Sequence, residues 1–121
     1  MKQLVALSCA VLSFVVFDAK ASFVVGAGGD TCGTWTRERQ ERRVTGYNQT
    51  VGWVLGYLRG RFDGLGLINE SGKQKDPLLA LKGGGADAVA GWLDKYCREH
   101  PLDRIFNASE ELSEELIQRS R

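Results

Sequence analysis

Histidine is nearly absent from this sequence: His100 is the one histidine among 121 residues, and only three cysteines accompany it. Structural zinc needs four ligands, and Cys32, Cys97 and His100 would supply three, so we expect no metal site. His100 also has no nucleophile to serve once the cysteines are paired. Acidic pairs such as Glu110 and Glu114 lie four residues apart, which is typical of a helix surface and not of a glycosidase site. We therefore expect no catalytic residue, no cofactor and no enzymatic activity.

A strand pattern is lacking as well. No segment alternates apolar and polar residues for long enough to predict a β-strand, and no internal repeat is visible. Residues 23–33, FVVGAGGDTCG, resemble the strand and glycine turn of a dinucleotide site, but Thr31 stands where the G-x-G-x-x-G fingerprint requires glycine. The sequence thus predicts an all-α fold.

No apolar run is long enough to be a confident membrane span. The longest, residues 4–17, is shorter than the roughly 20 residues that a spanning helix needs. Lys2 precedes it and the A-x-A pattern Ala19-Lys20-Ala21 follows, which predicts a secretory signal peptide cut after about Ala21. An anchored N-terminus is the alternative. We expect export to the periplasm, with no stable membrane insertion after cleavage.

An excess of charge of either sign is also missing. The predicted signal peptide holds two of the 16 basic and one of the 15 acidic residues, which leaves 14 of each. A neutral domain is not expected to bind nucleic acid through unspecific charge attraction. The charges are nevertheless uneven, with arginines such as Arg37, Arg39, Arg42 and Arg43 early and glutamates late.

Two cysteines remain after export, Cys32 and Cys97. In an oxidising compartment an even pair predicts a disulfide. Closing a loop of that length stabilises a fold by about 4 kcal/mol on the chain-entropy model.

Helical periodicity and capping residues predict a small single-domain bundle of four to five helices. We expect helices over 34–43, 48–61 and 86–99 and a short helix after Asp76-Pro77. The last helix is expected to start at His100-Pro101 and to break near Asn107, because Asn107-x-x-Glu110 resembles a capping box. The domains expected are the signal peptide 1–21, a flexible N-terminal arm 22–31, the helical domain 32–117 and a frayed tail 118–121.

Apolar residues at helical spacing predict the core. They include Val51, Val54, Leu55, Leu58, Phe62, Val89, Leu93, Leu102, Ile105, Phe106, Leu112 and Leu116, with Tyr47 and Cys97 beside them. The core aromatics are expected to be Trp35, Trp53, Tyr57, Trp92 and Tyr96.

Three glycines four residues apart, Gly52, Gly56 and Gly60, fall on one stripe of the helix predicted over 48–61. Each glycine inside a helix costs about 1 kcal/mol relative to alanine. We expect the stripe to let a neighbouring backbone approach closely, with Trp35 or Trp92 lying over it. A homodimer interface through the same stripe is the alternative.

All three asparagines, Asn48, Asn69 and Asn107, stand in N-x-S/T sequons, the acceptor pattern for glycosylation in secreted eukaryotic proteins. Asn48 and Asn107 are better explained as helix caps.

Three stretches carry a family resemblance: CGTW (32–35), YNQTVGWVLGYLRG (47–60) and GWLDKYCREHPLD (91–103). Their layout resembles the HdeA/HdeB family of periplasmic acid-stress chaperones, in which a glycine-tyrosine helix lies between two cysteines and a proline follows the second. It is also similar to the Tai-type immunity proteins of type VI secretion. The segment 63–85 is an insert relative to the HdeA/HdeB family, and the further cysteines usual in the immunity group are lacking.

The resemblance to HdeA/HdeB implies a chaperone that loosens at low pH and holds unfolding periplasmic clients on apolar helical surface. The resemblance to the Tai-type group implies a fixed surface that binds and blocks one toxin, for which Arg37, Arg39, Arg42, Arg43 and the loop 63–75 are candidates. An envelope protein with another structural or assembly role is a third hypothesis.

Overall fold

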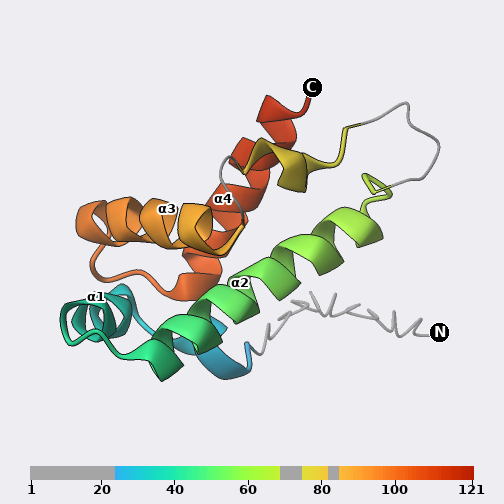
Figure 1. The fold of residues 1–121 in the computed structure, drawn as a ribbon. Helices are drawn as coiled ribbons and strands as arrows, with labels where there is room; N and C mark the ends of the chain where they lie inside the picture. The colour runs from blue at the N-terminus through green and yellow to red at the C-terminus, as the bar shows by residue number, and fades with distance from the viewer. Residues whose placement is uncertain (1–23, 69–74, 82–84) are drawn as a thin grey trace, which may run out of the picture.

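The computed structural model describes residues 24–68, 75–81 and 85–121 (Figure 1). The predicted signal peptide and Asn69 lie outside the described residues. Four α-helices and two short 3-10 helices follow one another as η1 (Gly26–Gly29), α1 (Cys32–Gln40), α2 (Val44–Gly64), η2 (Pro77–Ala80), α3 (Ala86–Glu99) and α4 (Ile105–Arg119). The all-α prediction is confirmed, since the described residues form helices and one isolated bridge between Thr31 and Arg104. Within those ranges, no helix combines the length and apolarity needed to cross a membrane.

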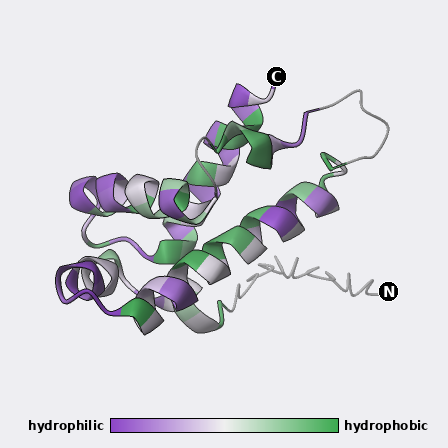
Figure 2. Ribbon diagram, in the orientation of Figure 1, coloured by the Kyte–Doolittle hydropathy of each residue, from purple (hydrophilic) through white to green (hydrophobic). Residues whose placement is uncertain are grey.

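The long helix α2 organises the molecule. It contacts α1, α3, α4 and both 3-10 helices (Figure 1). α1 lies beside the C-terminal half of α3, and η2 packs on α4. Hydrophobic residues gather along the middle of α2, whereas hydrophilic residues cover α1 and the neighbouring end of α3 (Figure 2).

The helix ends correct several sequence-based boundaries. α1 starts at Cys32 because the Thr31 side chain accepts a hydrogen bond from the Thr34 amide. Arg42, with a left-handed φ of 52°, separates α1 from α2. α2 then begins at Val44, so Asn48 lies inside the helix and is not its cap.

The C-terminal half is closer to the sequence prediction. α3 has the expected bounds, and the side chain of Asp76 caps η2 by accepting from the Leu78 amide at 2.9 Å. Asn107 does not interrupt α4: it lies in the first turn and accepts from the Arg104 amide at 3.2 Å. α4 continues to Arg119, so the tail expected to fray from residue 118 is helical for two more residues.

Residues 24–31 belong to the fold and are not the flexible arm that the sequence suggests. The Arg104 guanidinium donates to the Gly29 carbonyl and the Ile105 amide to the Asp30 carbonyl, both at 2.9 Å. The amide of Cys32 donates to the carbonyl of Asp103 at 2.8 Å. These bonds hold η1 at the start of α4, and η1 also contacts α2.

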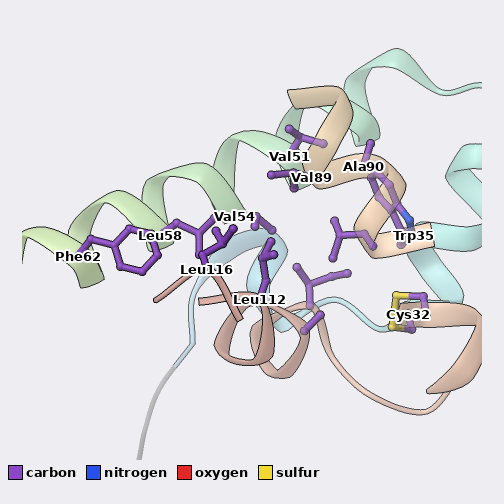
Figure 3. Close-up of a cluster of buried hydrophobic side chains, with 14 residues drawn as sticks. Cys32, Trp35, Val51, Val54, Leu58, Phe62, Val89, Ala90, Leu112 and Leu116 are labelled. Carbon is purple, nitrogen blue, oxygen red and sulfur yellow. A yellow bond between two sulfur atoms is a disulfide. The ribbon is translucent and has the colours of Figure 1, made fainter. Parts of the chain in front are cut away.

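The core is elongated and follows α2 (Figure 3). Phe62 lies at one end and Trp35 beside Cys32 at the other, with Val54 and Leu58 between them. The aliphatic core residues predicted in α3 and α4 are buried as expected, whereas Phe106 is half-buried and Leu102, in the loop before α4, is 94% exposed. Pro101 ends α3, so Leu102 falls outside any helical face.

The predicted disulfide is confirmed. Cys32 at the start of α1 is bonded to Cys97 near the end of α3, across a sequence separation of 65 residues, and both are buried.

Candidate interaction surfaces

The glycine stripe faces solvent. Gly52, Gly56 and Gly60 are exposed, and a Cβ atom added to any of them would meet no atom of the described residues within 4 Å. The expectation that they admit a neighbouring backbone of the same chain, with Trp35 or Trp92 above, is wrong. At about 100° per residue, Gly56 and Gly60 point roughly opposite to the buried Val51 and Phe62, so the core covers the other side of α2.

Two other glycines do make close contacts, Gly46 with the Glu38 side chain and Gly28 of η1 with Trp53. Gly28 is buried, and a Cβ added to it would overlap the six-membered ring of Trp53. The Trp53 indole N–H donates to the Val25 carbonyl at 2.9 Å, and its ring stacks on Tyr57 with centroids 5.6 Å apart. The glycine-rich stretch after residue 25 therefore packs against the Trp53 ring and does not form a nucleotide-binding turn.

Of the five expected core aromatics, only Trp35 is fully buried. Trp53, Tyr57, Trp92 and Tyr96 are half-buried and pack on the outside of the core. Each therefore presents part of its ring to solvent. Sequence periodicity places these side chains near the core, but a large ring at the edge of a helix face covers the core without being enclosed by it.

Carboxylates link the helices to one another. Asp94 of α3 accepts from the Trp35 indole at 2.9 Å and from the Arg39 guanidinium at 2.7 Å, which joins α1 to α3. Arg39 also lies over the rings of Trp35 and Tyr47, 5.5 Å from each centroid.

Three further links involve the other helix pairs. Tyr47 donates to Asp87 at 3.0 Å between α2 and α3, and Trp92 donates to Glu115 at 2.7 Å between α3 and α4. Arg61 pairs with Glu114 at 2.5 Å between α2 and α4. In the described part of the chain, every side-chain hydrogen bond that joins two α-helices is thus accepted by a carboxylate.

A cleft of about 510 Å³ lies between α3 and α4. One wall is a stack of Trp92, Tyr96 and His100, with centroids 5.1 Å and 4.4 Å apart. The other wall holds four carboxylates, on Asp103, Glu111, Glu114 and Glu115. The Tyr96 hydroxyl donates to Asp103 at 2.7 Å.

The three tyrosines share one electrostatic feature. Burial, together with the hydrogen bond to Asp103 and the negative charges of Asp103 and Glu111, raises the pKa of Tyr96 well above its ordinary value of 10.0. Burial first, then the bond to Asp87, raises the pKa of Tyr47, and burial raises that of Tyr57. All three hydroxyls therefore hold their protons more tightly than free tyrosine does.

A hollow of about 780 Å³ lies between α1 and α3. We call it the arginine hollow, because Arg37, Arg39, Arg42 and Arg98 line it, with Gly33, Cys97 and Pro101 among its other lining residues. Asp94 is its one lining carboxylate, and Arg39 already pairs with it. Of the arginines predicted as a binding surface, Arg43 does not line this hollow and pairs with Glu41, while Arg98 joins it from a distant part of the sequence.

The described residues contain no group of three or more histidine, cysteine, aspartate or glutamate side chains that is arranged to hold a metal ion. Comparisons of the chain with protein-family models, with curated proteins and with solved structures gave no match in any of the three.

Proposed function

We propose that this chain is a non-enzymatic exported protein that binds unfolding proteins when acid loosens its helices, as the resemblance to the HdeA/HdeB family implies. The observation that supports the proposal is the use of carboxylates as the acceptors between α-helices in the described residues. Asp and Glu side chains as a class become protonated as the pH falls below about 4. An ion pair whose carboxylate is protonated loses its attraction, and a hydrogen bond from an indole or a phenol to such a group loses its charge assistance.

Two further features favour opening without complete unfolding. Protonation leaves the arginines and lysines uncompensated, and their mutual repulsion favours an expanded state. The Cys32–Cys97 disulfide still holds α1 to α3. The side chains freed at the helix contacts include tryptophans, which supply adhesive apolar surface for a client.

The test uses light scattering. At pH 2–3 the purified, oxidised protein should suppress aggregation of acid-unfolded periplasmic proteins, and at pH 7 it should not. A variant that replaces the four linking carboxylates, Asp87→Asn, Asp94→Asn, Glu114→Gln and Glu115→Gln, should suppress aggregation at a higher pH than the parent does.

A matched control replaces four exposed carboxylates that link no helices, with Asp63→Asn, Glu99→Gln, Glu110→Gln and Glu111→Gln, and should keep the parent's pH range. Equal shifts in both variants would assign the effect to total charge alone. A protein that loses its near-UV circular dichroism in acid and still suppresses nothing would exclude the chaperone function.

Blocking a single toxin, as in the Tai-type group, is the second candidate function. It is favoured by the arginine hollow, a charged concave surface that exists without any acid-induced change.

A further inference from the structure

We infer that the arginine hollow binds a carboxylate-rich segment of a protein partner at neutral pH, with Arg37, Arg42 and Arg98 as the contacting residues. This inference does not depend on acid loosening, and of the helix contacts that acid would break the hollow includes only the one between Arg39 and Asp94.

The charge of the hollow is unbalanced. Arg39 and Asp94 neutralise each other, whereas the guanidinium groups of Arg37, Arg42 and Arg98 make no hydrogen bond or ion pair with the described residues. All three side chains are exposed, and all three line the same hollow. Among the described arginines, only Arg121 at the chain end is equally unengaged, so the unpaired guanidinium groups are concentrated here and not scattered.

An anionic occupant follows from this arrangement. Like charges around one concavity repel, and a negative group placed among them removes that repulsion. Guanidinium groups bind carboxylates through two parallel hydrogen bonds, which gives geometric selectivity beyond charge. A volume of about 780 Å³ accommodates several side chains, which favours a protein segment over one small inorganic anion.

The walls of the hollow are held in place before any partner arrives. The disulfide fixes Cys97 to the start of α1, and the Asp94 carboxylate fixes Trp35 and Arg39 to α3. Preorganised walls lower the entropy lost on binding. Arginine residues on such a surface are typical of the energetically important residues of protein interfaces.

The experiment measures fluorescence anisotropy at pH 7 with a labelled twelve-residue peptide rich in aspartate and glutamate, using the purified, oxidised protein. A peptide of the same length with asparagine and glutamine at those positions serves as the neutral probe. We expect binding of the acidic peptide alone, weakened by added salt because salt screens charge.

The variant Arg37→Gln, Arg42→Gln and Arg98→Gln should weaken binding about tenfold or more, which corresponds to about 1.4 kcal/mol. The matched control Arg59→Gln, Arg119→Gln and Arg121→Gln removes three exposed arginines that do not line the hollow and should bind as the parent does. Circular dichroism checks that both variants keep the parent's helix content.

Four results would overturn the inference. Equal losses in both variants, or no binding of the acidic peptide by the parent, would exclude a localised site. Full competition by millimolar sulfate would show a small-anion site. Self-association at pH 7 that disappears in the Arg37/Arg42/Arg98 variant would show that a second copy of this chain, through its glutamate-rich α4, is the occupant.

Discussion

At the scale of single residues, five of the six tryptophan and tyrosine side chains donate a hydrogen bond to a specific oxygen. Trp35, Trp92, Tyr47 and Tyr96 donate to carboxylates, and Trp53 donates to a backbone carbonyl. Large aromatic side chains that are only half-buried gain a fixed orientation from these bonds. Because four of these partners are carboxylates, a fall or a rise in pH affects that orientation.

Alkaline pH tests this at Tyr96. Its raised pKa means that the folded state keeps the hydroxyl proton at a pH where an unfolded chain, with the ordinary value near 10.0, has lost it. The stability that this contributes is therefore complete below about pH 10 and is lost as the pH rises toward the folded pKa. A titration followed by tyrosinate absorbance should show the last ionisation above that of free tyrosine.

Two substitutions identify the group. Tyr96→Phe should remove this last ionisation, and Asp103→Asn should lower its pKa because a negative hydrogen-bond acceptor is lost. If all three tyrosines ionise together near pH 10 while circular dichroism reports a folded protein, the burial of the Tyr96 hydroxyl is contradicted.

At the scale of helices and segments, glycines of this chain have opposite roles that their spacing alone does not reveal. Gly28 makes room for the Trp53 ring, whereas Gly56 lies on the open side of α2. Gly56→Ala should therefore stabilise the protein by about 1 kcal/mol through helix propensity, and Gly28→Ala should destabilise it because Trp53 must move. Urea unfolding at neutral pH measures both.

The same changes at Gly52 and Gly60 extend the test, since neither glycine has a neighbour in the described part of the chain that a methyl group would meet. A loss of stability at Gly52, Gly56 and Gly60, together with a smaller assembly in sedimentation, would instead show that a second copy covers the stripe.

How far the sequence predicted these elements differs along the chain. The bounds of α3 and the cap at Asp76 were predictable because one amphipathic period and one capping residue determine them. The start of α2 was predicted too late because Gly46 suggests a helix break. In the structure Gly46 lies inside α2, where its missing side chain leaves room for the Glu38 carboxylate. The packing of Trp53 on Gly28 depends on a contact between residues 28 and 53, and a local sequence pattern does not reveal a contact between residues so far apart.

The candidate sites also combine features that the local sequence predicts with features that depend on the fold. The arginines of α1 were expected at a surface, but Arg98 joins them only because the fold lays α3 beside α1. The exposed position of the glycine stripe was in principle predictable, because a helical wheel places Gly56 and Gly60 roughly opposite to Val51 and Phe62. A helical wheel does not show, however, that no further element of the described residues covers that side of α2.

At the scale of the whole molecule, the disulfide connects the two regions with proposed activities. Cys97 lines the arginine hollow, and its bond to Cys32 is the covalent link that remains between α1 and α3 when acid protonates carboxylates. Removal of the disulfide should therefore lower the stability at neutral pH and increase the unfolding in acid, and the two effects have different causes.

The double variant Cys32→Ala, Cys97→Ala should lower the free energy of unfolding at pH 7 by about 4 kcal/mol, the chain-entropy value for a loop of this length. In acid it should expand further than the parent, because charge repulsion then acts on an untethered chain, and small-angle scattering at pH 2 measures the difference in radius. Equal radii for variant and parent would show that the disulfide does not limit the acid state. If the variant is as stable as the parent at pH 7 but expands further than the parent at pH 2, the disulfide has its role only in acid, where the proposed client binding takes place.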